Sequence, residues 1–383
     1  MEKEIGIYIH IPFCKSKCFY CNFASYCNMD KYIEEYINAV CNEIIKNAEI
    51  LSEYKIKTVY FGGGTPSYID SKYIVQIMNT LKLFNKSNNE FSEVTIEVNP
   101  NSVTFEKLKD YKECGINRLS VGLQSTNNEV LKSIGRTHTY SDFVTTLQNA
   151  KKALFTNISI DLIYPLPNMD INILEDTLNI IDDLKEEYNI KHISIYNLEV
   201  HENTKLDFLL KNDFLFLVDE DEEYKMREII HSKLQNMGYS KYEMSNFAIK
   251  GYESKHNINY WNQGSYLGFG VAASSFMLGS RYKNNDDIKK YINAINKNLN
   301  CIDEKDDLDK LDLMKEYVIL RLRLCDGINI NRFNKKFSTD IFSIFGTEIN
   351  DLVNKGLLLK NENTITLSKR GEEVANIVWE NFV

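Results

Sequence analysis

The sequence predicts an α/β fold for residues 1–205, in which helices cover a parallel sheet. Three observations support this prediction. Apolar segments of strand length alternate six times with longer helix-like segments, the connections between them are short, and the apolar segments are almost continuously hydrophobic. Strands that are buried on both faces have such continuous apolar runs. Six β/α units fit either a doubly wound sheet or an incomplete β/α barrel, and the periodicity does not distinguish the two.

The expected elements follow one another in a regular order. The expected strands are Ile5–His10, Lys57–Phe61, Val94–Val98, Arg118–Leu123, Ile158–Tyr164 and His192–Leu198. The expected helices lie at residues 31–51, 71–84, 104–113, 127–154 and 173–187.

Glycine, proline and polar residues gather where these strands end. They are Gly62–Ser67, Glu97–Pro100, Gln124, Ser125, Asp161–Pro167, Tyr196 and Asn197. Sites on parallel β/α folds are built at the carboxyl ends of the strands. The sequence therefore predicts one site that is assembled from several loops.

Beyond residue 205 the alternation ends, and two further regions are expected. Residues 206–302 form an accessory segment, with a charged helix at 219–237, an added strand at 239–247, and glycine- and aromatic-rich stretches at 254–261 and 266–276. These stretches predict a strand-and-loop surface that lines a flat cavity.

Residues 303–383 make up the last expected region. The acidic stretch 303–312 is expected to be a linker with a solvated face. A winged-helix-like module is expected after it, with helices at 313–324, 330–336 and 341–355, a hairpin at 356–367 and a last helix at 368–382.

The composition argues against several classes of protein. The chain has 383 residues, a net charge of −9, 43% hydrophobic and 26% charged residues, which is ordinary for a globular protein. The negative charge and the lack of a basic stripe in the last module argue against nucleic-acid binding. No apolar run approaches the ~18 residues of a membrane span, so no stable membrane insertion is expected. The first residues lack a signal-peptide pattern, which favours the cytoplasm.

Three cysteines, Cys14, Cys18 and Cys21, follow the first strand in a C-x3-C-x2-C pattern. Clustered thiolates suit zinc or an iron–sulfur cluster. A structural zinc site needs four ligands, which His10 or Cys27 could complete, whereas a cluster held by three thiolates leaves one iron open to a substrate. The spacing leaves both alternatives open. We expect Cys27 to be a bystander and no disulfide framework to form.

Six motifs share one resemblance. They are Tyr8–Cys14 with the three-cysteine pattern, Phe61–Ser67, Ile96–Pro100, Asn117–Ser125, Gly135–His138 and Asp161–Tyr164. Together they resemble the radical S-adenosylmethionine (SAM) superfamily and, in finer detail, its coproporphyrinogen III dehydrogenase-like branch. The resemblance runs from Tyr8 to the last helix. It implies a partial (β/α)6 TIM-like barrel, which resolves the ambiguity that the periodicity leaves.

The resemblance also implies residue roles. Cys14, Cys18 and Cys21 would hold three irons of a [4Fe–4S] cluster, and SAM would chelate the fourth. One electron would then cleave SAM to a deoxyadenosyl radical, while the protein positions and shields the cofactor. The residues implied in SAM binding are Tyr8, Tyr20, Gly63, Gly64, Thr65, Glu97, Gln124, Arg136 and Asp161. No residue is assigned as catalytic.

Two features separate the functions within this branch. The oxygen-independent coproporphyrinogen oxidases have a fourth cysteine two residues after the third, where this chain has Phe23. Residues 256–261, His-Asn-x-x-Tyr-Trp, resemble the haem-binding signature of the HemW-type haem chaperones. This signature implies that His256 ligates haem iron, with Tyr260 and Trp261 packed on the porphyrin. The resemblance therefore favours a chaperone that binds haem, the cluster and SAM and passes haem to acceptor proteins.

Three positions depart from the family pattern. Pro165 stands where glycine is usual, His201 where glutamate is usual, and Ser274 where histidine is common. These departures concern the lining of the cavity and not the cluster. The remaining histidines receive no role, and they are His138, His192, His201 and His231.

Three alternatives to the chaperone stay open. They are an oxygen-independent coproporphyrinogen III oxidase, a haem-degrading radical SAM methyltransferase and a zinc-stabilised interaction protein. The expected partners, besides haem and its acceptors, are a reducing protein such as flavodoxin or ferredoxin and a second copy of the chain in a homodimer.

Overall fold

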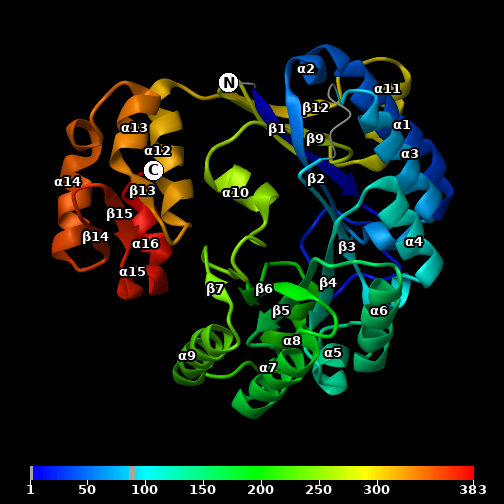
Figure 1. Cartoon of the computed structure of the whole chain (residues 1–383), viewed down its shortest axis with the longest axis horizontal. Helices are drawn as coiled ribbons and strands as arrows, with labels where there is room; N and C mark the ends of the chain where they lie inside the picture. Colours follow the sequence, from blue (N-terminus) through cyan, green and yellow to red (C-terminus); the bar gives the residue numbers. More distant parts are fainter. Residues whose placement is uncertain (1–2, 86–90) are drawn as a thin grey trace.

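The computed structural model describes residues 3–85 and 91–383, and its centre is a curved sheet with six parallel strands (Figure 1). These strands are β1 (Glu4–Ile11), β2 (Lys55–Gly63), β3 (Glu93–Val98), β4 (Arg118–Gln124), β5 (Ile158–Tyr164) and β6 (Ile190–Asn197). They neighbour one another in chain order, and each neighbouring pair is parallel. The predicted strands of the first region are therefore confirmed.

Shorter strands extend this sheet at both edges. They are β7 (Ser240–Lys241), β8 (Asn246–Ala248), β9 (Tyr266–Phe269), β10 (Ser274–Met277), β11 (Ser280–Asn284) and β12 (Ile302–Asp307). The order of strands runs from β12 through β9, β1 and β6 to β7, and these two ends do not pair with each other among the described residues. The sheet is therefore a partial barrel, as predicted, and not a closed one.

Helices cover the outer face of the six parallel strands (Figure 1). They are α1 (Ile33–Lys46), α2 (Ala48–Glu53), α3 (Ser71–Lys82), α4 (Phe105–Cys114), α5 (Asn128–Ser133), α6 (Tyr140–Lys152) and α7 (Ile171–Lys185), whereas α8 (Lys205–Lys211) lies beside the loop that carries the cysteines, where Leu206 N donates to the Phe19 carbonyl at 2.8 Å. Short 3₁₀ turns precede three of them, at Asp30–Tyr32, Pro66–Tyr68 and Pro100–Ser102.

The prediction of a single helix over residues 127–154 is wrong, because α5 and α6 are separate. Gly135 follows α5 with a φ of +73°, a left-handed conformation that favours glycine and ends a helix. A capping box of Thr139 and Asp142 then starts α6. The interruption matters because it places Arg136 between the two helices, at the end of the sheet where the cysteines lie.

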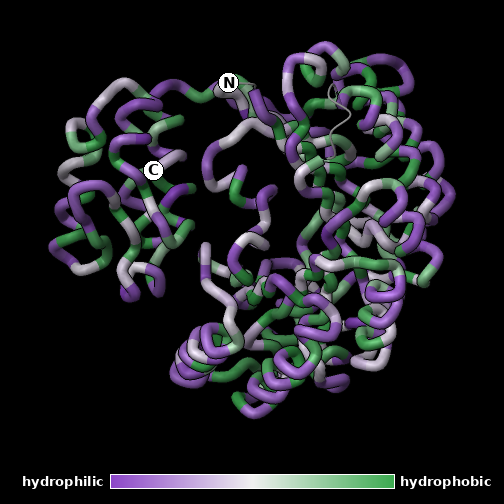
Figure 2. Tube along the Cα trace, in the orientation of Figure 1, coloured by the Kyte–Doolittle hydropathy of each residue, from purple (hydrophilic) through white to green (hydrophobic). Residues whose placement is uncertain are grey.

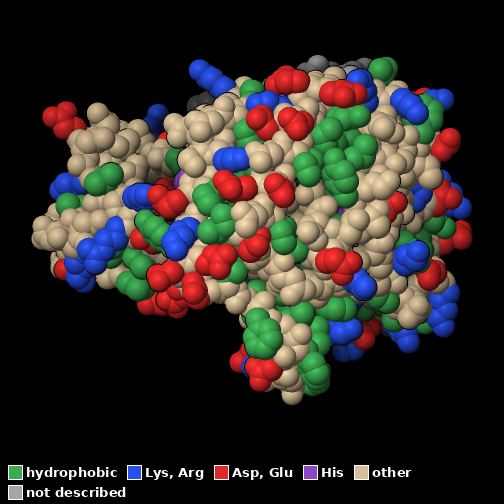
Figure 3. All heavy atoms as spheres, turned by 90° about the horizontal axis from the view of Figure 1, so that it is seen from below, with side chains coloured by type: hydrophobic (Ala, Val, Ile, Leu, Met, Phe, Trp, Pro, Cys, Tyr) green, Lys and Arg blue, Asp and Glu red, His purple; other side chains and the backbone are tan. Residues whose placement is uncertain are grey.

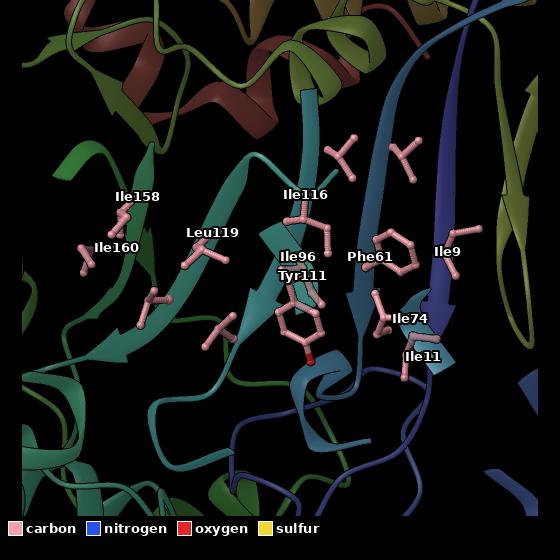
Figure 4. Packing of buried hydrophobic residues seen from close by; sticks show 14 of the residues in the cluster. Ile9, Ile11, Phe61, Ile74, Ile96, Tyr111, Ile116, Leu119, Ile158 and Ile160 are labelled. Atoms are coloured by element: carbon pink, nitrogen blue, oxygen red, sulfur yellow. The ribbon is translucent and has the colours of Figure 1, made fainter. Parts of the chain in front are cut away.

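The core lies between the sheet and its helices, and Figure 4 shows part of it. Ile9, Phe61 and Ile96 from neighbouring strands are fully buried. Ile74 of α3 and Tyr111 of α4 pack against them from the helical layer. Burial of each such side chain stabilises the fold by about 1.5–3 kcal/mol. This core fixes the strand ends, and so it fixes the loops that follow them.

The C-terminal region has a second core of its own. Its elements are α12 (Lys310–Leu322), β13 (Ile328–Asn329), α13 (Ile330–Phe337), α14 (Ile341–Asn354), β14 (Leu358–Lys360), β15 (Thr364–Leu367), α15 (Lys369–Glu373) and α16 (Ala375–Glu380). Helices and a three-stranded sheet enclose this core, which agrees with the predicted module. Contacts join it to the first body, among them the hydrogen bond of 2.7 Å from Arg321 Nη1 to Asn262 Oδ1.

Three further helices are α9 (Glu220–Asn236), which packs on α7, α11 (Ile288–Asn296), which packs on α1, and α10 (Lys255–Trp261), which contacts both β2 and α12. Helix α9 is hydrophilic over most of its surface (Figure 2). It buries a stripe of Met226, Ile230 and Leu234, whose spacing of four residues places them on one helix face.

The prediction that residues 303–312 form a linker is wrong for most of that stretch. Residues 302–307 form β12, which pairs with β11 at the sheet edge. The acidic side chains are exposed there, and charged side chains on an edge strand discourage pairing with other chains. On the face shown in Figure 3, Lys and Arg side chains are interspersed with Asp and Glu. Across the described residues, no helix is long and apolar enough to cross a membrane.

Candidate functional site

Hydrogen bonds hold the loop that carries the three cysteines against the end of β1. Cys14 N donates to the Tyr26 carbonyl at 3.0 Å, and Tyr26 N donates to the Pro12 carbonyl at 2.7 Å. Farther along the loop, Phe19 N donates to the Ile134 carbonyl at 3.0 Å. The loop is thus fixed at both sides, which orders the thiol groups before any ligand binds.

The thiols of this loop face neighbours that suit a metal cluster. Burial raises the pKa of the Cys14 thiol to about 11, and the Thr65 hydroxyl lies 3.4 Å from its sulfur. Arg136 Nη1 lies 3.5 Å from the Cys18 sulfur, so a cation stands beside the thiols. A cation and a hydroxyl donor stabilise thiolate ligands of the kind that iron–sulfur clusters need.

The zinc alternative finds less support in this loop. His10, one of the two residues that could complete a zinc site, has both ring nitrogens occupied. Nδ1 lies 3.0 Å from the Tyr8 hydroxyl, and Nε2 lies 2.8 Å from the Ala24 carbonyl.

The glycine run after β2 lets this strand approach the cysteine loop. A Cβ atom on Gly64 would lie 2.8 Å from the Pro12 carbonyl carbon and 3.0 Å from the Cys14 sulfur. Gly63 has a φ of +112°, and a Cβ there would lie 2.5 Å from the His10 ring. Both positions therefore require glycine for packing. The glycines also leave their backbone open to a ligand beside the cysteines.

The residues predicted to hold the cluster and SAM come together around one cavity of about 440 Å³, which we call the strand-end cavity. Its lining includes Cys14, Cys18, Cys21, Tyr20, Gly63, Gly64, Thr65, Glu97, Gln124, Arg136 and Asp161. Of the residues predicted for this site, Tyr8 is the exception, because it lines a second cavity.

Two carboxyl groups give the strand-end cavity its acidic character. Burial, and then the nearby Asp161, raise the pKa of Glu97 to about 7, while the Tyr60 hydroxyl donates to its Oε1 at 3.0 Å. Burial also raises the pKa of Asp161, whose Oδ2 accepts from Ser120 Oγ at 2.9 Å. Two buried carboxyl groups that affect each other's charge suit a ligand that donates from hydroxyl or ammonium groups.

Gln124 supplies a direct test of whether such a ligand fits. Its side-chain Oε1 is buried without a hydrogen-bond partner in the described part of the chain, and its backbone has a φ of +69°. Buried acceptors are almost always paired in native proteins. An acceptor held open at this place is what a bound SAM molecule, with its donor groups, would satisfy.

A second, larger cavity of about 870 Å³ lies on the other side of the cysteine loop, and we call it the aromatic cavity. Its lining includes the aromatic residues Tyr8, Tyr260, Trp261, Tyr266 and Phe276. Lys17, Asn22, Phe23 and Ser25 line both cavities, so the loop that carries the cysteines separates them. The Phe23 side chain is 63% exposed, and it stands at the boundary.

His256 lies beside the aromatic cavity in a buried position. The prediction of a strand-and-loop surface is wrong here, because residues 255–261 form α10. Glu93 caps this helix, with Oε2 accepting from Lys255 N at 2.9 Å and Oε1 from His256 N at 3.0 Å. The imidazole is 1% exposed, and burial, with Arg118 next, lowers its pKa to about 3. His256 is therefore a neutral imidazole near pH 7.

Both ring nitrogens of His256 already have partners. Nδ1 lies 2.8 Å from the Thr58 hydroxyl, and Nε2 lies 2.7 Å from the Tyr260 hydroxyl. The residues of this motif that face the cavity are Tyr260 and Trp261. Ligation of haem iron by His256 stays a prediction, and it would require one of these two hydrogen bonds to break.

Two of the three departures from the family pattern line the cavities. His201 lines the strand-end cavity, and Ser274 lines the aromatic cavity. Pro165 follows a cis peptide bond after Tyr164. Cys27 is partly exposed, and burial raises the pKa of its thiol.

Sequence reasoning missed several residues of both sites. Tyr60 and Ser120 line the strand-end cavity, and Arg281 and Lys283 line the aromatic cavity. Tyr60 and Thr58 are spaced by two residues on a strand, so both point into the barrel. For Tyr60 the sequence holds a signal, because Thr58 and Tyr60 are polar residues at alternate positions of an otherwise apolar strand.

Comparisons with known proteins agree with this geometry. Residues 8–181 match the radical SAM superfamily, and residues 308–372 match the HemN C-terminal domain. The chain is 34% identical to the heme chaperone HemW of Bacillus subtilis over 376 residues, which covers 98% of each chain. It is also 34% identical to the heme chaperone HemW of Lactococcus lactis, over 100% of this chain and 98% of the relative.

A solved structure is similar over the whole chain. It is the coproporphyrinogen III oxidase HemN of Escherichia coli, with a TM-score of 0.85 and 23% identity, covering 100% of this chain and 90% of that one. At this identity the similarity shows a common fold.

Proposed function

The chain belongs to the HemW family within the radical SAM superfamily, and from this premise we propose that it is a haem chaperone. It binds haem, a [4Fe–4S] cluster and SAM, and it transfers haem to acceptor proteins. The observation that carries this proposal is the pair of cavities on the two sides of the cysteine loop. A chaperone of this kind needs a place for haem that is separate from the place for SAM.

The strand-end cavity is the place for the cluster and SAM. Cys14, Cys18 and Cys21 hold the cluster, and the unpaired acceptor of Gln124 supports a ligand with donor groups beside it. When bound, a reduced cluster can supply one electron to SAM. The protein's own contribution is to exclude water and to keep Glu97 and Asp161 facing this ligand.

The aromatic cavity is the place for haem. Its volume of about 870 Å³ lies at the upper end of the range for small-molecule sites. Aromatic side chains stack on flat ligands at centroid distances of about 4.5–7 Å. The lysine and arginine residues in the lining, Lys17, Arg281 and Lys283, provide partners for carboxylate groups such as haem propionates.

A coproporphyrinogen III oxidase is the second candidate, favoured by the common fold with that enzyme over the whole chain. The position two residues after Cys21 argues against it, because Phe23 has no thiol. A haem-degrading methyltransferase would use the same cavities, and the experiment below distinguishes it from a chaperone.

The test is anaerobic reconstitution of the cluster, followed by three assays on one preparation. The chaperone predicts one haem bound per chain, transfer of that haem to an acceptor apoprotein, and no change in coproporphyrinogen III when SAM and a reductant are added. Formation of protoporphyrinogen would show the oxidase instead. Loss of the haem spectrum with SAM and reductant would show the methyltransferase.

The remaining parts of the proposal concern partners and location. A flavodoxin or ferredoxin would reduce the cluster, which reduction assays with each protein can measure. Light scattering of the reconstituted protein tests a homodimer. We place the chain in the cytoplasm because its eight cysteines are all unpaired, as thiols are in a reducing compartment.

A further inference from the structure

We propose that the phenol oxygen of Tyr260 ligates the haem iron, and that His256 is the positioning residue that holds this oxygen in place. The inference rests on the proposed function, because it concerns haem in the aromatic cavity. It differs from the sequence-based expectation, in which His256 itself ligates the iron. Three observations support Tyr260 as the ligand in place of His256: His256 is buried, both of its ring nitrogens are hydrogen-bonded, and Tyr260 lines the cavity.

The wall of the cavity places Tyr260 among rings suited to a porphyrin. The Tyr260 and Tyr266 rings meet edge to face at 4.5 Å, and Tyr266 lies 6.5 Å from the Phe276 ring. Tyr260, Tyr266 and Phe276 all line the cavity, together with Trp261. A macrocycle in this cavity would therefore lie against Tyr260, and a phenolate is a known axial ligand of haem iron.

The other candidate ligands in the lining are occupied by internal hydrogen bonds. His10 bonds through both ring nitrogens to Tyr8 and to the Ala24 carbonyl. The Tyr26 hydroxyl donates to the Asp286 carbonyl. The Tyr8 hydroxyl pairs with an imidazole, that of His10, as Tyr260 pairs with His256, so Tyr8→Phe is a required control, and loss of the phenolate vibrations in that variant would overturn the inference. Tyr266 is the nearest rival of Tyr260, but no imidazole of the described residues is hydrogen-bonded to its hydroxyl.

His256 is built to support a ligand. Nε2 lies 2.7 Å from the Tyr260 hydroxyl, and Nδ1 lies 2.8 Å from the Thr58 hydroxyl. The imidazole also stacks on the Tyr60 ring at 5.2 Å. Residues four apart on α10 lie on one helix face, which brings His256 beneath Tyr260. An imidazole held in this way cannot turn toward the cavity unless it gives up these contacts.

The proton balance of ligation is simple in this arrangement. The Tyr260 oxygen loses its hydroxyl proton to the solvent as it binds ferric iron, so one proton leaves for each haem bound. The Nε2–H of neutral His256 then donates to the phenolate oxygen, and Nδ1 accepts from the Thr58 hydroxyl. Outer partners of this kind orient and stabilise metal ligands.

Cations at the rim of the cavity support the same placement of haem. Arg281 and Lys283 are two residues apart on β11, so both face the aromatic cavity. Each has an acidic partner, Glu316 for Arg281 and Glu304 for Lys283. Haem propionates can replace these carboxylates. The iron would then lie deeper in the cavity, near the aromatic side chains.

The experiment is a titration of the full chain, with its cluster reconstituted, by ferric haem. Resonance Raman and electron paramagnetic resonance spectra identify the iron ligand directly. We expect phenolate vibrations in the wild-type complex and their loss in Tyr260→Phe. In His256→Ala we expect the phenolate vibrations to persist with about tenfold weaker haem affinity, and His256→Gln, whose amide can still bond to the phenol, to recover part of that affinity.

Controls keep the outcomes apart. Tyr282→Phe removes a phenol from the same strand as Arg281 but on the opposite face, where it lines a different cavity, and it should leave the haem spectrum unchanged. Circular dichroism and cluster content show that each variant is folded. An imidazole spectrum that His256→Ala abolishes and Tyr260→Phe retains would overturn the inference, as would loss of the phenolate vibrations in Tyr266→Phe. Wild-type protein that binds no haem would contradict the proposed function itself.

Discussion

The two cavities on either side of the cysteine loop are lined by different types of residue from different parts of the chain. The strand-end cavity takes its lining from the loops after parallel strands, and it has Glu97 and Asp161 as acidic groups beside three thiols. The aromatic cavity takes its lining largely from the region after residue 255, with rings and few acids. One is suited to a polar cofactor next to a metal cluster, and the other to a flat apolar ligand with charged edges. The difference follows from the elements that build each cavity: the loops after the parallel strands line the first, and α10 with the edge strands β9–β11 lines much of the second.

The largest expected effect is a loss of the cluster with little change in haem affinity. Cys18→Ala should remove nearly all cluster iron, because three thiolates are needed to hold the cluster. Haem affinity should stay within about twofold, since Cys18 lines the strand-end cavity and not the aromatic one. Iron and sulfide analysis, with a haem titration on the same sample, measures both.

Cys27→Ala is the matched control for this variant. Cys27 lies in the same loop but lines neither cavity, so its loss should leave the cluster in place. A parallel loss of haem affinity in Cys18→Ala would show that the two sites are one.

The next effect concerns the close packing between the glycine run and the cysteine loop. Gly64→Ala would press a methyl group against Pro12 and Cys14, so we expect the free energy of unfolding to fall by about 1–3 kcal/mol, and the cluster to bind poorly. Denaturant unfolding and cluster content measure these two changes. Gly346→Ala in α14 is the control, because its nearest neighbour lies 3.7 Å away, and it should not destabilise the chain.

A smaller effect should be confined to the affinity for SAM. Gln124→Met removes the buried, unpaired Oε1, so SAM affinity should fall about tenfold, the equivalent of one lost hydrogen bond. Without SAM the variant should be at least as stable as the wild type, because an unsatisfied buried acceptor has been removed. Calorimetric titration and thermal unfolding measure the two. Gln235→Met on the exposed face of α9 should change neither, and unchanged SAM affinity in Gln124→Met would remove Gln124 from the site.

The last effect is a pH dependence that belongs to the strand-end cavity. The pKa of Glu97 is raised from 4.5 to about 7 in the folded chain, so the folded state binds this proton more tightly than the unfolded state. The free energy of unfolding of the ligand-free protein should therefore fall as the pH rises through that window. Denaturant unfolding at several pH values between 4.5 and about 7 measures this. The free energy of unfolding should change less with pH in Glu97→Gln than in the wild type. The exposed Glu129→Gln should keep the wild-type slope, and an equal slope in Glu97→Gln would contradict the assignment.

The strand-end cavity could be predicted largely from the sequence. Its residues follow apolar strands, and the ends of parallel strands meet at one edge, so Glu97, Gln124 and Asp161 had to lie near the cysteines. The interruption at Gly135 was missed, because the apolar periodicity of residues 127–154 continues across it. The charged strand at 302–307 was missed for a related reason: acidic residues on an exposed edge have the composition of a linker.

The aromatic cavity was predicted in composition but not in arrangement. The motif at 256–261 indicated a ligand, yet the sequence does not tell which of its side chains faces the cavity. That depends on how α10 packs, and Glu93, far away in the chain, caps this helix. The result is that His256 points to Thr58 while Tyr260 faces the cavity.

The most direct test of two separate sites is a haem titration of protein that already holds its cluster and SAM. We expect one haem to bind per chain, SAM to stay bound at equilibrium, and the spin signal of the reduced cluster to be unchanged. Release of SAM in proportion to added haem would contradict this expectation, because haem and SAM would then share a single cavity.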